Sequence, residues 1–340
     1  MGLRELAGRY GEALDREMKR ALGEWEGGLY RMLRYHLGWL DENGRPARNG
    51  GKALRPILCL LSSEAVGGDW RRAVSLAASM ELIHNFSLIH DDIQDGDRER
   101  RHRPTVWALW GKPQAINAGT AMWVLAQRVS LGAGEITAQP CSSLEAYRVL
   151  DAATLEMIEG QFLDLSFEGR MDIDVPQYLD MVRRKTGVLM GCSLQLGALA
   201  GGAGLEEQQA FRKCGLHLGQ AYQIIDDFLG IWGAPEITGK PQASDLLRRK
   251  KSFPVAYALE HSTDRNRDEL VALYLREDWM DDEKGRVLEL LEEAGAKAST
   301  YQWAERECRL ALDDLEGLSM APWARRQFDE VAEFFIGRDK

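Results

Sequence analysis

The stretch Leu88-Ile-His-Asp91-Asp92-Ile-Gln-Asp95 is the most informative part of the chain, and it ends a long run of apolar residues at helical spacing. In a helix, Asp91 and Asp95 lie one turn apart on one face, with Asp92 about 100° around the axis from Asp91. Carboxylates this close repel one another unless a cation lies between them. Basic residues follow at positions 100–103. Acids that can hold Mg²⁺ therefore stand beside cations that can bind a diphosphate ester.

Composition and charge limit the classes of protein to which the chain can belong. Its 340 residues, 45% of them hydrophobic, are enough to bury a full core. The net charge of −10 argues against a nucleic-acid partner. Five widely spaced cysteines predict reduced thiols in a cytoplasmic protein, not a disulfide or zinc framework. We see no signal-peptide core and no apolar run near the roughly 20 residues that a membrane span needs.

Apolar residues recur every three or four positions over most of the chain, which predicts helices, and strand-like alternation is missing. Breaks rich in Gly and Pro separate the segments. The predicted helices cover residues 3–40, 57–65, 73–90, 114–131, 144–165, 188–199, 206–232, 255–261, 282–294, 300–315 and 321–335. We predict one all-α domain over residues 1–340, a single-domain bundle of about a dozen helices around a central active-site cavity.

Two simpler explanations of the first acid cluster deserve comparison with metal binding. One is a solvated acidic helix end, which the cluster alone does not exclude. The other is an EF-hand calcium loop that starts at Asp91. That loop needs an acidic or amide ligand at position 3 and Glu at position 12, where this chain has Ile93 and His102.

A second acid pair makes a solvated helix end a poor explanation. Asp226 and Asp227 stand near the end of another predicted helix, in the segment 219–230, GQAYQIIDDFLG. Two such pairs could clamp one metal–diphosphate cluster from both sides. Basic residues also recur beside the acid pairs or near Gly and Pro, and in the segment 50–56 a helix N-terminus adds backbone N–H groups for an anion. These basic residues are Lys52, Arg55, Arg100, Arg101, Lys185, Lys240 and Lys250.

Together these segments resemble the trans-isoprenyl diphosphate synthases, the family that joins isopentenyl diphosphate to an allylic diphosphate. The matching segments are GGKALRP (50–56), ELIHNFSLIHDDIQD (81–95), RRHRPT (100–105), GQFLDL (160–165), KTG (185–187), QAYQIIDD (220–227), GKPQASDLLRRKKSFP (239–254) and FFIGRDK (334–340). Their order and spacing fit nearly the whole chain. The resemblance implies the all-α isoprenoid synthase fold, a Mg²⁺-dependent prenyltransferase and a homodimer.

The resemblance also implies a role for each matching residue. Mg²⁺ would be held by Asp91, Asp92, Asp95, Asp226 and Asp227. The allylic diphosphate would be contacted by Arg100, Lys185 and Lys240, with Gln161 and Asp164 in support and Lys250 nearby. Isopentenyl diphosphate would bind without metal to Lys52, Arg55, His84 and Arg101. The residues near the reacting carbons would be Thr186 and Gln223.

The physical chemistry of these roles is coherent. An allylic C–O bond ionises when the charge that develops on the leaving diphosphate is neutralised by Mg²⁺ and fixed cations. The carbocation must be kept from water, which calls for a dry cavity between apolar helices. The isopentenyl double bond then attacks and a proton is lost, and we hypothesise that the departing diphosphate accepts it. No protein nucleophile is needed.

Four positions depart from the pattern of the family that the chain resembles. Ala53 stands where many members carry Arg, and Thr120 stands where Asp is common. His102 replaces a usual Gly. Gly230 replaces the third acid of the second cluster, which leaves the strength of a third metal site open.

The length of the product depends on what stops the growing chain in the cavity. Phe86 lies five residues before Asp91, where short-chain members of the family carry an aromatic residue. A helical wheel would instead favour Ser87, and Phe86 could also be ordinary core. On the resemblance we expect geranylgeranyl diphosphate as the product, with farnesyl diphosphate next.

Two other functions must be weighed against a prenyltransferase. A class I terpene cyclase shares the fold but binds no second diphosphate, so it would not need Lys52, Arg55 and Arg101. A non-catalytic subunit of a heteromeric synthase should have lost acids from the first cluster, yet all three are present.

Overall fold

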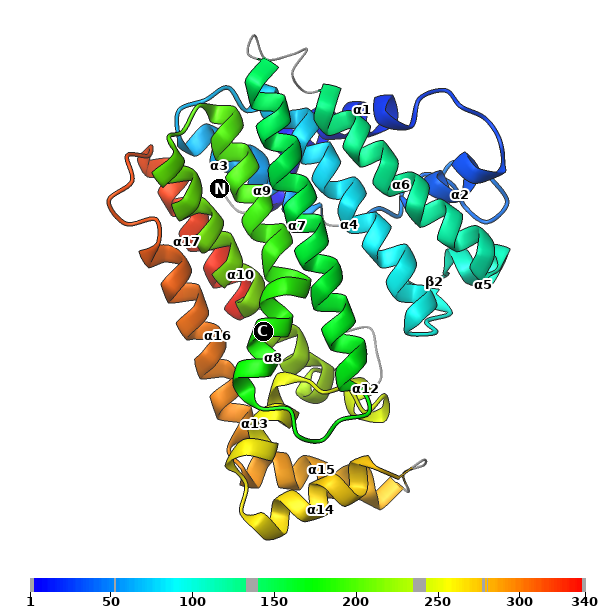
Figure 1. Ribbon diagram of the computed structural model, residues 1–340, viewed down its shortest axis with the longest axis vertical. Coiled ribbons are helices and arrows are strands. Elements are labelled where there is room, and N and C mark those ends of the chain that lie inside the picture. Colours follow the sequence, from blue (N-terminus) through cyan, green and yellow to red (C-terminus); the bar gives the residue numbers. More distant parts are fainter. Residues whose placement is uncertain are drawn as a thin grey trace. The chain divides into compact units, whose positions relative to one another are not determined.

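The computed structural model describes residues 3–51, 53–132, 140–234, 243–276, 279 and 281–337, and these residues are mostly helical (Figure 1). The first helices are α1 (Leu3–Leu22), α2 (Gly28–His36), α3 (Leu54–Ala65), the 3₁₀ turn η1 (Trp70–Ala73), α4 (Val74–Gln94), α5 (Val106–Trp110), α6 (Lys112–Gly132) and α7 (Pro140–Phe167). Next come α8 (Val175–Val182), the π-helix η3 (Arg183–Gly187), α9 (Val188–Gly201) and α10 (Leu205–Trp232). The last are α12 (Ser244–Leu247), α13 (Phe253–His261), α14 (Asp264–Tyr274), α15 (Asp281–Glu293), α16 (Ala296–Asp313) and α17 (Pro322–Ile336). The prediction of an all-α fold is confirmed.

By their internal contacts the residues group into two compact units. The first unit consists of residues 1–154, 192–211 and 319–325, and the second consists of residues 155–191, 212–318 and 326–340. Helices α7, α9, α10 and α17 contribute residues to both units. The first acid cluster belongs to the first unit and the second acid pair to the second. A single domain with one central cavity between the two acid clusters stays a prediction.

In the first unit, α4 is the central helix and packs on α1, α3 and α6, with α6 lying alongside it (Figure 1). Most side chains of α4 up to Ile89 are buried, so its apolar pattern has no polar stripe. The acids come at the end of this buried helix, where Asp95 is the C-cap residue. Burial of the helix thus fixes the position from which the acids emerge.

In the second unit, a core joins α8, α10, α13 and α16 through apolar residues such as Tyr178, Ile224, Phe253 and Ala304. A further cluster packs α12, α14 and α15 against α13. The π-helix η3 continues directly from α8 into α9. A π turn holds one residue more than an α turn and is frequent at functional sites.

Several elements differ from those that the sequence predicted. The predicted helix over residues 3–40 is two helices, α1 and α2, because Gly23 and Gly27 adopt positive φ angles of 62° and 129° between them. The helices α5, α8, α12 and α14 were not predicted, since most are too short or too polar to show periodicity. Asp174 and Gln177 do form a capping box at the start of α8, a signal that the sequence carries.

A two-residue hairpin was also not predicted. Strands β1 (Glu99–Arg100) and β2 (Arg103–Pro104) pair in antiparallel register, with Arg100 opposite Arg103. The turn residues Arg101 and His102 have left-handed φ angles of 53° and 58°. A two-residue hairpin of this kind needs positive φ at both positions, which is why Gly suits position 102 better than His.

None of the described helices combines the length and the hydrophobicity that a membrane-spanning helix needs.

Candidate active site

Asp92 is a buried carboxylate with one oxygen bonded and one oxygen open. Its side chain is 1% exposed, and Oδ1 accepts a hydrogen bond of 2.7 Å from Arg100 Nε. Oδ2 is buried and has no hydrogen-bond partner among the described residues. Burial raises the pKa of this carboxyl to about 6, although Arg100 opposes the shift. A buried carboxylate oxygen without a donor is satisfied by a bound cation, so Asp92 fits the metal role predicted for it.

The other two acids of the first cluster lie beside Asp92 but do not complete a metal-binding group with it. Asp91 precedes Asp92 in the last turn of α4, and Asp95 is the C-cap residue of that helix. Among the described residues, no three His, Cys, Asp or Glu side chains already form a metal-binding group. A metal bound here would therefore draw ligands together, with the diphosphate of a substrate completing the shell.

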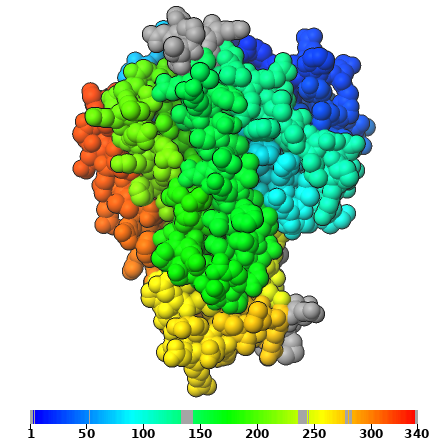
Figure 2. All heavy atoms as spheres, in the orientation of Figure 1, coloured from blue at the N-terminus to red at the C-terminus, as the bar shows by residue number. Residues whose placement is uncertain are grey.

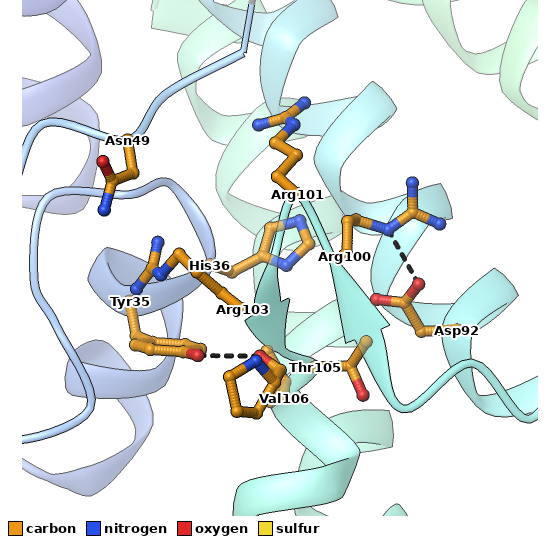
Figure 3. Close-up of a pocket in the computed structure, with 10 residues that line it drawn as sticks. Tyr35, His36, Asn49, Asp92, Arg100, Arg101, Arg103, Thr105 and Val106 are labelled. Atoms are coloured by element: carbon orange, nitrogen blue, oxygen red, sulfur yellow. Dashed lines mark hydrogen bonds and ion pairs between the residues drawn. The ribbon is translucent and has the colours of Figure 1, made fainter. Parts of the chain in front are cut away.

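The hairpin supplies a basic pocket beside Asp92. In Figure 3, Arg100, Arg101 and Arg103 surround a hollow whose lining contains Asp92 as its one carboxylate. The Arg103 guanidinium lies 4.1 Å from the centre of the Tyr35 ring and donates a 2.7 Å hydrogen bond to the Leu40 carbonyl. Three guanidinium groups around one carboxylate leave an excess of positive charge, which suits an anion.

His84 joins this basic region from within α4. Burial, followed by the nearby charges of Arg55 and Arg101, holds the pKa of His84 well below its usual range. The imidazole is therefore neutral at physiological pH and can donate one N–H. Arg101 also lies against Gly51, where an added Cβ would collide with the guanidinium. Three residues predicted for isopentenyl diphosphate, namely Arg55, His84 and Arg101, are thus brought together, whereas Lys52 lies outside the described residues.

In the second unit, η3 presents two of the predicted residues. Lys185 forms an ion pair with Asp164, which lies on α7. Burial would raise the pKa of Asp164, but Lys185 and then Lys250 hold it below its usual value. Thr186 Oγ1 donates a hydrogen bond of 3.1 Å to Gln223 Oε1 on α10. A Cβ at Gly160 would overlap the Lys185 backbone, so only Gly lets α7 approach the π-helix this closely.

The two aspartates of the second acid pair differ more in their surroundings than the sequence suggests. Asp227 is 1% exposed and accepts hydrogen bonds from Tyr178, Gln223, Lys250 and the Phe253 backbone N–H. Its carboxylate is therefore saturated and does not fit a metal ligand without losing a donor. Asp226 precedes it on α10 and acts electrostatically on Lys250.

Asp245 occupies the space next to Gly230, where the family that the chain resembles has a third acid. A Cβ at Gly230 would overlap the carboxylate of Asp245. Asp245 lies on α12, and its Oδ2 is 3.9 Å from Lys250 Nζ. The missing acid at position 230 thus coincides with a carboxylate that reaches the same part of α10 from another helix. Lys240, which was predicted to bind the allylic diphosphate, lies outside the described residues.

Comparisons with known proteins identify the family of the chain. The polyprenyl synthetase family model matches residues 39–291. The chain belongs to the polyprenyl synthetase family. A (2E,6E)-farnesyl diphosphate synthase of Mycobacterium tuberculosis (strain ATCC 25618 / H37Rv) is 41% identical over 315 residues, covering 90% of this chain and 85% of the relative. A geranylgeranyl diphosphate synthase of the same organism is 41% identical over 258 residues, covering 76% and 72%.

A solved structure supports the same assignment. The crystal structure of a polyprenyl synthetase from Streptomyces coelicolor A3(2) superposes with a TM-score of 0.90 at 38% identity, covering 98% of this chain and 99% of that one. This polyprenyl synthetase is accordingly a trans-prenyltransferase of the short-chain type. The resemblance inferred from the sequence is confirmed.

Phe86 lies in the core of this polyprenyl synthetase, 8% exposed, with its ring edge-to-face against His90 at 5.0 Å. The His90 ring lies against Gly119 of α6. The Ser87 hydroxyl donates to the His84 carbonyl at 2.8 Å, so it is engaged within its own helix. Phe86 is thus the larger obstacle one turn before the acids, although ordinary core packing gives it the same contacts.

Sequence reasoning missed three residues that the structure places beside predicted ones: His36, Tyr178 and Asp245. His36 lines the pocket of Figure 3, and its Nε2 is buried without a partner among the described residues. Burial, together with the three arginines of that pocket, lowers its pKa to about 3. None of the three lies in a charged cluster that would mark it, except that Asp245 falls within the segment 239–254 that matched the family.

The contact between Gly230 and Asp245 yields a prediction about the departure at position 230. Gly230→Asp should lower the free energy of unfolding by about 2 kcal/mol, because the new side chain overlaps Asp245 and places like charges together. Denaturant unfolding would measure the change. Gly285→Asp is the matched control, since Gly285 faces open space on α15. Stability unchanged in Gly230→Asp, or raised, would contradict the overlap.

Proposed function

We propose that this prenyltransferase condenses isopentenyl diphosphate with allylic diphosphates and stops at geranylgeranyl diphosphate. The observation that carries the proposal is the arrangement along α4. His84, with Arg55 and Arg101 near it, precedes Asp91 by seven residues, which is about 10 Å on the same helix face. One helix thus carries residues suited to a metal-free diphosphate next to residues suited to a metal-bound one.

In this proposal the acids hold the metal and the bases hold the substrates. Mg²⁺ held by Asp91, Asp92, Asp95 and Asp226 would supply charge neutralisation at the allylic diphosphate. Arg100 would fix Asp92 and contact the same diphosphate, while Lys185, Lys240 and Lys250 would add positive charge. Gln161 and Asp164 would hold Lys185 in place.

The chain's own residues then govern the reaction. The allylic C–O bond breaks, its electron pair leaves with the diphosphate, and the isopentenyl double bond forms the new C–C bond. A proton leaves the resulting cation for the departing diphosphate. Thr186 and Gln223 would lie near the reacting carbons, and apolar side chains would keep water from them. Arg55, His84, Arg101 and Lys52 would hold isopentenyl diphosphate in position for attack.

The rival functions fit less well. A class I terpene cyclase has no use for the basic set around His84, which would then be a costly concentration of like charge. A non-catalytic subunit has no need for the buried open oxygen of Asp92. The relatives named above are diphosphate synthases with farnesyl or geranylgeranyl products.

The decisive assay is product analysis with the purified chain, isopentenyl diphosphate, farnesyl diphosphate and Mg²⁺. We expect a prenyl diphosphate, and Asp91→Ala should reduce its formation at least about a thousandfold, because a metal ligand is lost. A hydrocarbon formed from farnesyl diphosphate alone would indicate a cyclase. The absence of any product from the wild-type chain would indicate a subunit that needs a partner. Near-normal rates in Asp91→Ala would refute the metal role of Asp91.

The product should lengthen when Phe86 is made small. Phe86→Ala is expected to shift the products by one or more five-carbon units, because the growing tail is no longer stopped one turn before Asp91. Chromatography of the dephosphorylated alcohols would measure the distribution. Ser87→Ala is the neighbouring control and should leave the distribution as it is. The same products from both variants would remove Phe86 as the stop.

We also propose a homodimer in the cytoplasm. Helix α6 buries one face against α4 and exposes large apolar side chains on the other: Ile116, Trp123, Val124 and Leu131. Figure 2 shows α6, in the blue-green part of the colour range, at the surface. A row of this kind is typical of a surface that another chain covers. The described cysteines Cys59, Cys192, Cys214 and Cys308 are buried thiols, as in a reducing compartment.

Trp123→Arg tests the dimer. The charge should disrupt the apolar contact and convert the protein to a single chain, which sedimentation velocity measures as half the mass. Trp25→Arg is the matched control, because Trp25 is 63% exposed on another part of the first unit. A mass unaffected by Trp123→Arg would place the interface elsewhere.

A further inference from the structure

The acid pair on α10 contains a carboxylate that is already fully used. Asp227 Oδ1 accepts from Gln223 Nε2 at 3.0 Å and from Lys250 Nζ at 3.1 Å. Its Oδ2 accepts from the Tyr178 hydroxyl and from the Phe253 backbone N–H, the latter at 2.9 Å. A carboxylate offers about four acceptor positions, and here four donors fill them.

Two of the donors to Asp227, both to Oδ2, would be costly to displace. Tyr178 is 1% exposed, so its hydroxyl has no water to turn to. The Phe253 N–H belongs to the first turn of α13, where no earlier turn supplies a carbonyl acceptor. A metal ion bound to Oδ2 would leave one of these buried donors unsatisfied, and one bound to Oδ1 would have to displace Gln223 or Lys250. Geometry therefore favours the four protein donors over a cation.

Charge leads to the same conclusion. Lys250 Nζ lies between Asp227 and Asp245. Its ammonium group is 3.1 Å from Asp227 Oδ1 and 3.9 Å from Asp245 Oδ2, so Lys250 already pairs with the negative charge of Asp227. Little negative charge is left on this carboxylate for a divalent ion.

The contact with Gln223 extends the influence of Asp227 to η3. A carboxylate only accepts, so Gln223 must turn its amide N–H₂ toward Asp227, one helical turn away. Its Oε1 then points the other way and accepts from Thr186 Oγ1. The hydroxyl proton of Thr186 is thereby committed to Gln223. Asp227 thus determines the orientation of two side chains predicted to lie near the reacting carbons.

We propose that Asp227 is a positioning residue that orients Gln223, Thr186 and Lys250, and that Asp226 alone of this pair binds metal. The inference rests on the proposed function for the identity of the reaction, but its metal-binding part does not depend on turnover. It separates two adjacent aspartates that look equivalent in the sequence.

The first experiment compares Asp226→Asn with Asp227→Asn. Binding of Mn²⁺ is measured in the presence of inorganic pyrophosphate, by calorimetry and by the loss of the free-ion paramagnetic resonance signal. We expect Asp226→Asn to weaken Mn²⁺ binding at least tenfold and Asp227→Asn to change it less than threefold. Equal weakening in the two variants would overturn the proposal.

A second experiment, steady-state kinetics of two variants, tests whether Asp227 acts through Gln223. Asp227→Asn should lower kcat at least a hundredfold, with the KM of both substrates and the Mg²⁺ dependence within threefold of wild type. Tyr178→Phe removes one donor from Asp227 but leaves its charge, Gln223 and Lys250. It should lower the unfolding temperature while kcat falls less than tenfold. If kcat in the two variants simply followed their stability, a structural role alone would be indicated and the proposal would fail.

A double variant distinguishes loss of side-chain orientation from misfolding of Asp227→Asn. Gln223→Glu combined with Asp227→Asn exchanges donor and acceptor across the same contact and keeps an acceptor for Thr186. It should retain Mn²⁺ binding and recover at least tenfold in kcat over Asp227→Asn. No recovery in a folded double variant would count against the positioning role. A wild-type chain that binds Mn²⁺ but makes no prenyl diphosphate would instead contradict the proposed function and leave the binding comparison valid.

Discussion

A carboxylate taken out of water must find hydrogen-bond donors or cations for both of its oxygens, and this requirement organises both acid clusters of the protein. At Asp92 the protein supplies Arg100 for one oxygen and nothing among the described residues for the other. At Asp227 it supplies four donors. The first arrangement leaves one buried oxygen without a donor, whereas the second satisfies both oxygens. Two aspartate pairs with similar sequence contexts therefore have different physical states.

The basic residues present the opposite case, in which clustered positive charge lacks a matching anion. Arg101 sits in a left-handed turn and lies against Gly51, and His84 is kept neutral by burial beside Arg55 and Arg101. Holding like charges together costs free energy, which an incoming diphosphate would release. The backbone of the hairpin that carries Arg100 and Arg101 is also strained at His102, a position that Gly would occupy at lower cost. Backbone strain and clustered like charges are both common at binding sites.

Much of the fold and the family could be predicted from the sequence, because long amphipathic helices and the spacing of Asp91, Asp92 and Asp95 are local patterns. Helix α14, with its polar start at Asp264, and the four-residue α12 show no such pattern and were missed. The distinct states of Asp226 and Asp227 depend on Tyr178 and Lys250, which are 49 and 23 residues from Asp227. Spacing shows which residues share a helix face, but not which lone pairs other helices have already filled. The match of Asp245 to the gap at Gly230 was hidden for the same reason.

The π-helix between α8 and α9 places a constraint on the length of this segment. Because each helical residue turns the chain by about 100°, the extra residue in η3 rotates everything before it relative to α9. Removing one residue between Arg183 and Gly187 would restore regular winding, yet it would swing Thr186 away from Gln223 or Lys185 away from Asp164. Single-residue deletions, which loops commonly absorb, are thus excluded from this stretch in any descendant that keeps both contacts, whereas substitutions that preserve the winding are not.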